Sequence, residues 1–198
     1  MASGTGWMCA VLALSCVMTA SAAPSMKDVL QASFKAKGQA TLERLDRDET
    51  QKACSTGEPL SGESAARIIA DNTATLRYPA EGRYLGDWQS GDKIAQTGTG
   101  LQSSDDPAKP AGGNCYACHQ LAEAEIAYGT IGPSLKQYGK LRGNSEAILK
   151  YTWAKIYNAQ AFMPCSTMPR FGHKNILTEQ QIRDVMALLF DPASPVNQ

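Results

Sequence analysis

Apolar residues recur at helical spacing in several stretches of the chain, whereas the strict alternation typical of strands is nearly absent. The clearest helical stretch lies near the C-terminus. Thr178 and Gln181 form a capping box ahead of it, and Asp191-Pro192 ends it. Its apolar face consists of Ile182, Val185, Met186 and Leu189. The pattern predicts a C-terminal helix that is buried along one side.

The same periodicity predicts further helices over residues 26–52, 63–76, 90–96, 120–127 and 145–157. In the last of these, the expected buried positions are Ile148, Tyr151 or Thr152, and Ile156. A turn-forming segment separates the first two helices, and a glycine-rich loop follows the third. With strand signals nearly absent, the sequence predicts an all-α protein.

The first residues of the chain have the features of an export signal. An apolar run over residues 7–18 is too short to span a bilayer, and Ala-Ser-Ala at residues 20–22 follows as a cleavage pattern. We therefore expect residues 1–23 to be a cleaved signal peptide. No Lys or Arg precedes the run, so an uncleaved anchor is the alternative, and Cys16 is a poor match to a lipidation site. The mature chain is predicted to be periplasmic, with no segment that crosses a membrane.

Five consecutive residues, Cys115-Tyr116-Ala117-Cys118-His119, form the C-x-x-C-H signature by which c-type haem is attached. Two thiols at this spacing reach the two vinyl groups on one edge of the porphyrin, and the histidine then lies under the iron. A zinc site would need a second close pair of ligands, and a redox dithiol would need a βαβ setting that the flanks do not show. The motif predicts one covalently bound haem c, held by Cys115 and Cys118, with His119 as the proximal iron ligand.

Met168 is the candidate for the distal iron ligand, because it lies in a Met-Pro-Arg-Phe-Gly run just before the C-terminal helix. A thioether opposite an imidazole raises the reduction potential of the iron relative to two imidazoles. The proline that follows stiffens the loop. Met163 and His173 are the alternative ligands, and a core methionine that fills a gap is the alternative interpretation of Met168.

The segment at residues 131–133 offers a backbone carbonyl to the Nδ1–H of His119, which would fix the orientation of the imidazole. An ordinary turn is the alternative interpretation of the same residues. Several apolar side chains are candidates for packing against the haem, although each suits a plain core position equally well. They are Tyr128, Leu135, Tyr138, Trp153 and Phe171.

Cys54 and Cys165 are left as a pair once the signal peptide and the haem motif have taken the other four cysteines. In an oxidising compartment we expect them to form a disulfide. It would close a loop of roughly 110 residues and contribute about 2–4 kcal/mol to the free energy of unfolding. The alternative is a reactive thiol at Cys165, near the haem.

Residues 87–198 have the length of a small cytochrome c domain. We therefore predict a class I-like cytochrome c fold there, preceded by an N-terminal helical extension over residues 24–86. No internal repeat or low-complexity tract interrupts either part. A disulfide between Cys54 and Cys165 would attach the extension to the haem domain.

Charge is unevenly distributed, although the formal net charge is zero. Residues 107–175 carry eight Lys or Arg and three Asp or Glu, whereas residues 24–106 carry ten and thirteen. A positive surface near a haem edge can steer an acidic partner, and an ordinary solvated surface is the alternative. Nucleic-acid binding is not expected, because there is no dense basic run and the chain carries an export signal.

Several stretches of this sequence resemble the SoxX family, the monohaem subunit of the SoxAX sulfur-oxidising complex. They are residues 86–88 (Gly-Asp-Trp), 91–96, 112–119 around the haem motif, 128–135 (Tyr-Gly-Thr-Ile-Gly-Pro-Ser-Leu), 138–143, 165–173 (Cys-Ser-Thr-Met-Pro-Arg-Phe-Gly-His) and 176–182. The resemblance as a whole covers nearly all of residues 78–196. The extension that contains Cys54 is also similar to the longer members of that family.

The resemblance implies a periplasmic heterodimer with a SoxA-type haem subunit. That complex oxidatively conjugates thiosulfate to a cysteine of a carrier protein (L-cysteine S-thiosulfotransferase), and its SoxA haem carries the reactive cysteine. In this chain the haem ligated by His119 and Met168 resembles the relay that passes electrons to a downstream cytochrome. The chain would then be a non-catalytic, electron-transfer subunit. A free-standing electron shuttle is the alternative function, and an enzyme that reduces peroxide at an open iron site is a third.

Overall fold

The computed structural model describes Met1 and residues 23–198. The predicted signal peptide therefore lies almost entirely outside the described residues. The chain forms two compact units, Met1–Phe34 and Lys35–Gln198. Within the first unit, α1 (Met26–Ser33) begins with a capping box between Ser25 and Asp28. No helix of the described residues has the length and apolar character needed to cross a bilayer.

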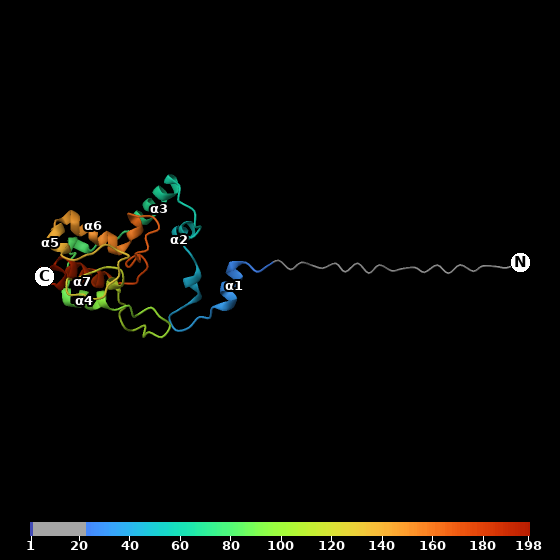
Figure 1. The fold of residues 1–198 in the computed structure, drawn as a ribbon, viewed down its shortest axis with the longest axis horizontal. Helices are drawn as coiled ribbons and strands as arrows, with labels where there is room; N and C mark the ends of the chain where they lie inside the picture. The colour runs from blue at the N-terminus through green and yellow to red at the C-terminus, as the bar shows by residue number, and fades with distance from the viewer. Residues whose placement is uncertain (2–22) are drawn as a thin grey trace. The chain divides into compact units, whose positions relative to one another are not determined.

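The regular secondary structure of the second unit is helical, with long loops between the helices (Figure 1). Its α-helices are α2 (Glu49–Cys54), α3 (Gly62–Ala74), α4 (Trp88–Gln96), α5 (Tyr138–Arg142), α6 (Glu146–Tyr157) and α7 (Glu179–Phe190). Its 3-10 turns are η1 (Leu42–Leu45), η2 (Ala80–Gly82), η3 (Cys115–Ala117), η4 (Ala159–Ala161) and η5 (Pro195–Asn197). Over the described residues no strand forms, and one isolated bridge joins Lys37 and Ala40. The predicted all-α class is confirmed.

Helix α7 is the element that the sequence predicts best. The Thr178 hydroxyl accepts a hydrogen bond from the Gln181 amide, and the Gln181 side chain accepts one from the Thr178 amide, so both hydrogen bonds of the N-terminal capping box are present. The helix ends at Phe190, immediately before Asp191-Pro192. Its predicted apolar face is fully buried. Local capping and amphipathic spacing are enough to specify this helix.

Helices α4 and α7 cross at close range (Figure 1). A Cβ atom on Gly91 would lie 2.1 Å from the carbonyl oxygen of Asp184 and 3.1 Å from the Cβ of Leu188, so this crossing requires glycine. Helix α4 begins earlier than predicted, because Asp87 is its N-cap and accepts a hydrogen bond from the Ser90 amide (2.8 Å). The crossing holds α4 against α7, and the C-terminal end of α4 leads into the loop before the haem motif.

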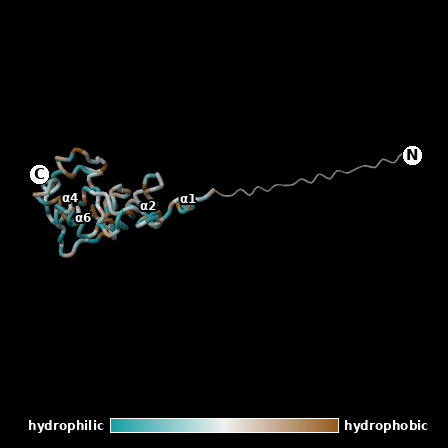
Figure 2. Tube along the Cα trace, turned by 90° about the horizontal axis from the view of Figure 1, so that it is seen from below, coloured by the Kyte–Doolittle hydropathy of each residue, from teal (hydrophilic) through white to brown (hydrophobic). Residues whose placement is uncertain are grey.

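The core is built mainly around α6 and α7, and hydrophobic positions interleave with hydrophilic ones along the trace of this unit (Figure 2). Its largest fully buried apolar side chains are Trp153, Ile182, Met186, Leu188 and Val196. In α6, Thr152 and Ile156 are buried and Tyr151 is exposed, which settles the alternative at that position in favour of Thr152.

The sequence-based prediction of one helix over residues 26–52 is wrong. The chain instead forms α1, η1 and α2, and it reverses at Gly38, whose φ is +53°. A Cβ at that glycine would lie 2.4 Å from the carbonyl oxygen of Ser103, so the turn is packed against a distant loop. Asp48 then caps α2 as a new helix. Helical periodicity alone did not reveal these breaks.

The helix expected at residues 120–127 is also absent from the structure. The carboxylate of Glu125 accepts hydrogen bonds from the amides of Leu121 (2.7 Å) and Ala122 (3.3 Å), and this closes a turn instead. Helix α5, by contrast, was not predicted. Its five residues are too few for a periodic pattern to be visible.

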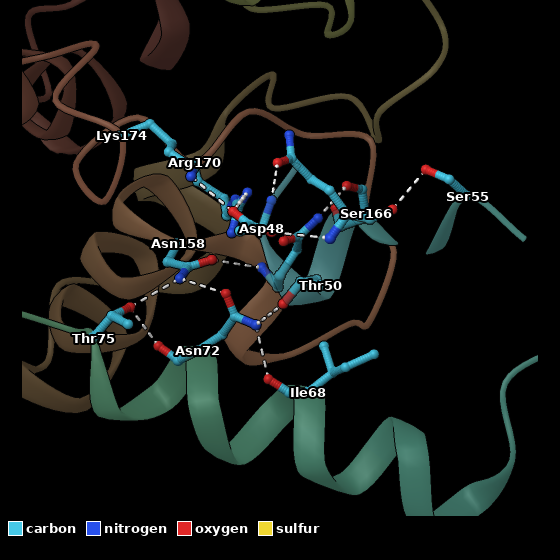
Figure 3. A network of polar contacts seen from close by, with 12 residues as sticks. Asp48, Thr50, Ser55, Ile68, Asn72, Thr75, Asn158, Ser166, Arg170 and Lys174 are labelled. Atoms are coloured by element: carbon cyan, nitrogen blue, oxygen red, sulfur yellow. Dashed lines mark hydrogen bonds and ion pairs between the residues drawn. The ribbon is translucent and has the colours of Figure 1, made fainter. Parts of the chain in front are cut away.

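Residues 35–86 pack onto the haem-bearing part of the second unit through a buried polar network (Figure 3). The Asn158 amide donates to the side-chain oxygen of Asn72 (2.9 Å), and the Asn72 amide donates to the hydroxyl of Thr50 (3.0 Å). The Trp153 indole also donates to the Arg77 carbonyl oxygen (2.7 Å). This part of the predicted extension is thus integrated into the same compact unit, and the domain boundary at residue 87 stays a prediction.

Candidate haem site

The haem motif forms a single tight helical turn. Asn114 has a left-handed conformation (φ +49°) that bends the chain into η3. The amides of Cys118 and His119 then both donate to the carbonyl oxygen of Cys115, each at 3.0 Å. Two thiols and an imidazole are therefore presented from one turn, which is the arrangement that the C-x-x-C-H spacing predicts.

The imidazole of His119 is oriented by a backbone carbonyl, as the sequence analysis expects. Its Nδ1–H donates to the carbonyl oxygen of Pro133 (2.6 Å). The loop that carries this carbonyl is tied back to the motif, because the Gly132 amide donates to the Cys118 carbonyl (2.8 Å) and the Gly129 amide to the Tyr116 carbonyl (2.9 Å). With Nδ1 protonated and bonded, Nε2 keeps its lone pair for the iron.

Gly132 packs directly on the imidazole ring. A Cβ atom at this position would lie 2.2 Å from Cε1 and 2.5 Å from Nδ1 of His119. A contact under 3.0 Å must be relieved by movement, and here the neighbour is a ring already fixed by a hydrogen bond. Gly132 is therefore a site residue. From the sequence, only the backbone carbonyls of the 131–133 segment were expected to matter.

We expect Gly132→Ala to displace the His119 ring and lower the yield of correctly ligated haem protein by about tenfold, equivalent to about 1.4 kcal/mol. The ratio of haem absorbance to protein after purification measures this. Gly62→Ala is the matched control, since a Cβ there meets nothing within 4 Å. Equal haem content in both variants would contradict the assigned packing.

The two motif cysteines are the free cysteines among the described residues. Cys115 packs against the core, and burial raises the pKa of its thiol to about 12. A redox dithiol or a nucleophile requires a lowered thiol pKa, so this environment is unlike that of a reactive cysteine. Within the described residues, no group of three or more His, Cys, Asp or Glu side chains comes together as a metal site. The zinc alternative therefore lacks its further ligands.

Met168 occupies a more suitable position for an iron ligand than Met163. Its side chain is partly buried against the core, and it also lines a cavity of about 510 Å³ to which none of Cys115, Cys118 and His119 contributes. Met163 is 59% exposed. His173 stays an alternative ligand, because burial together with the charges of Arg170 and Lys174 lowers its pKa and so favours the neutral imidazole that can bind a metal. Ligation by Met168 stays a prediction, and the partial burial of its side chain favours it over the exposed Met163.

The structure joins Cys54 and Cys165 by a disulfide, with a Cα–Cα distance of 5.4 Å and a sequence separation of 111 residues. Cys165 therefore carries no free thiol, which is the opposite of the reactive-thiol alternative. The bond links the end of α2 to the loop that carries Met168. It connects two segments that the sequence separates by more than half of the chain.

The apolar candidates for haem packing fall into different environments. Trp153 and Phe171 are buried in the core, and Leu135 and Tyr138 pack partly against it. Tyr138 also stacks edge-on against Phe190, with ring centroids 5.4 Å apart. Tyr128 is 42% exposed. Most of these side chains therefore pack in or against the protein core, which is the alternative to a role in packing against the haem.

One feature of the site is absent from the sequence-based prediction: an ion-pair cluster beside the Met168 loop. Asp48 Oδ2 accepts from the guanidinium of Arg170 (2.6 Å) and lies 2.7 Å from Lys174 Nζ. Burial alone would raise the pKa of Asp48, but the hydrogen bonds from Lys174, the Gln51 amide and Arg170 hold it well below its usual value. The sequence signals only the helix cap at Asp48, because its partners are more than a hundred residues away.

Residues 108–190 match the cytochrome c family. The chain is also 40% identical, over 157 residues, to a protein of Aquifex aeolicus (strain VF5) described as an uncharacterized lipoprotein. The match covers 77% of this chain and 73% of that protein. The fold and the haem motif thus define a protein with a cytochrome c domain, a class whose members hold haem c covalently and are typically extracytoplasmic.

This chain contains a cytochrome c domain, matched over residues 108–190, and it is related over 77% of its length to the Aquifex protein. Its residues fit the cofactor, because two thiols and an oriented imidazole come from one helical turn. Haem c supplies reversible one-electron chemistry when it is bound. The predicted cofactor is therefore confirmed at the level of the family.

Proposed function

We propose that this chain is the electron-relay subunit of a periplasmic SoxAX-type complex. Cys115 and Cys118 hold the haem, and His119 and Met168 are its axial ligands. The haem passes electrons from a SoxA-type partner to a downstream cytochrome. The sequence stretches shared with the SoxX family support this assignment, as do the fit of the haem residues and the family membership.

The observation that carries the proposal is which cysteines are bonded and which are free. Covalent chemistry on a sulfur substrate needs a thiolate beside the redox centre. Among the described residues, Cys115 and Cys118 are needed by the haem, and Cys54 and Cys165 are joined to each other. With no thiol left over in this part of the chain, an electron-transfer role fits better than a substrate-binding one.

The electron balance shows why a relay is needed. Joining a carrier-protein thiolate to thiosulfate forms one sulfur–sulfur bond and releases two electrons. A single haem accepts one electron at a time, so the relay haem must be reoxidised between the two transfers. A relay haem that is ligated on both faces changes its oxidation state without taking up substrate, and His119 and Met168 would provide such ligation.

The proposal places the mature protein in the periplasm. The Aquifex relative is described as a lipoprotein, which makes anchoring through Cys16 the alternative to cleavage at residues 22–23. The intact mass of the mature, haem-loaded chain distinguishes the two. A lipid-modified N-terminal cysteine would contradict cleavage at the later site.

The direct test is co-expression with a SoxA-type chain, followed by a thiosulfate-dependent haem-reduction assay with a carrier protein. We expect a stable heterodimer in which thiosulfate reduces the haem of this subunit only when the carrier and the SoxA chain are both present. A purified monomer that exchanges electrons freely and retains no haem partner would instead identify a free-standing shuttle.

A further inference from the structure

We propose that the N-terminal segment around α2 is a clamp on the Met168 loop, and that Asp48 and Cys54 act as positioning residues for the distal iron ligand. The clamp holds the loop on both sides of the methionine. The inference rests on the proposed ligation by Met168, and it assigns to residues outside the haem motif a part in keeping that ligand on the iron.

The first attachment is covalent and lies three residues before Met168. Cys165 is bonded to Cys54, at the end of α2. Cys165 itself is exposed, and its φ of +59° is unusual for a residue other than glycine. Packing therefore does little to hold this residue, and the disulfide is what fixes the position of the loop at this point.

The second attachment is ionic and lies two residues after Met168. Arg170 is only 7% exposed, and its guanidinium donates to Asp48 Oδ2 at 2.6 Å (Figure 3). Lys174 pairs with the same oxygen at 2.7 Å. Removing one partner of a buried charged pair leaves the other uncompensated. Arg170 would then lose the carboxylate that ties this part of the loop to the start of α2.

The clamp is itself firmly held. Asp48 caps α2, because its other carboxylate oxygen accepts from the Gln51 amide (2.9 Å). Two residues further on, Thr50 joins the buried network of Asn72 and Asn158, which are 3% and 0% exposed (Figure 3). Helix α2 is thus anchored to α3 and to the segment that follows α6, and it can resist movement of the Met168 loop.

Such a clamp matters because the bond between a thioether and ferric iron is weak. Between its two attachments, the loop from Cys165 to Arg170 contains no helix or strand of its own. A ligand on a loose loop spends more time away from the metal, and an external ligand can then take its place. Holding both ends lowers the population of this open state.

The test measures imidazole binding to the ferric, haem-loaded protein, together with the near-infrared band of the Fe(III)–S(Met) bond. We expect Asp48→Asn and the double variant Cys54→Ser/Cys165→Ser each to weaken the band. Each should also speed imidazole binding about tenfold, the factor that corresponds to about 1.4 kcal/mol. Asp48→Glu, which keeps the charge, should restore much of the wild-type rate.

Glu49→Gln is the matched control. It removes an exposed ion pair with Lys52 on the same helix, beside Asp48, and should leave both readouts unchanged. If the wild-type protein shows no Fe(III)–S(Met) band, the assignment of Met168 as ligand fails. If the band is present, but Asp48→Asn and the disulfide-free variant both bind imidazole at the wild-type rate, the clamp is refuted and the ligation stands.

Discussion

The double variant Cys115→Ala/Cys118→Ala will retain no haem after denaturation and acidic organic extraction. Only thioether bonds survive this treatment, and both are formed from the thiols of one helical turn. Removing them leaves at most axial contacts, which break when the chain unfolds. The measurement is the pyridine haemochrome absorbance of the extracted protein, which should fall to the background of a haem-free sample.

The single variants provide the control for this experiment. Cys115→Ala and Cys118→Ala should each keep one thioether, and therefore measurable haem with a shifted absorbance maximum. The disulfide-free variant should keep the full wild-type absorbance, because Cys54 and Cys165 are bonded to each other. If covalent haem persisted in the double variant, the attachment residues would have to be reassigned.

Replacing Met168 by alanine will abolish the near-infrared band of the Fe(III)–S(Met) bond and lower the reduction potential. Loss of the soft sulfur ligand removes its preference for Fe(II). We expect a fall on the order of 0.1 V, within the roughly 0.8 V range over which axial ligands set haem potentials. Optical spectra of the ferric protein and a redox titration report the two effects independently.

Met163→Ala is the comparison that makes this result specific. Met163 is largely exposed and lies in the same connecting segment, so its loss should change neither the band nor the potential. The reverse outcome, with the band lost in the Met163 variant and kept in the Met168 variant, would transfer the ligand role to Met163. Persistence of the band in both would exclude either methionine.

Sequence patterns predicted the features that depend on neighbouring residues. The capping box of α7 and its apolar face follow from residues within one or two turns. The haem motif likewise carries its chemistry in five consecutive positions. The carbonyl that orients His119 was expected within residues 131–133, shortly after the motif in sequence, and the structure identifies Pro133.

Other expectations failed where a contact that apolar spacing does not reveal, distant in one case and local in the other, overrides the helical pattern. The predicted helix over residues 26–52 is broken because the turn at Gly38 packs against Ser103. The segment after His119 forms a turn because Glu125 satisfies two backbone amides that a helix would have used differently. In both cases the apolar spacing was compatible with a helix, and a single polar or steric contact decided against it.

By itself, the sequence determined the all-α class, the covalent haem and the residues available to hold it, because these depend on residue type and short spacing. Only the tertiary structure decided that Gly132 lies against His119 and that Asp48 pairs with Arg170 across 122 positions. The same holds for the link between α2 and the Met168 loop through Cys54 and Cys165. Such contacts depend on which distant segments come together in the folded chain, and no local sequence pattern specifies this.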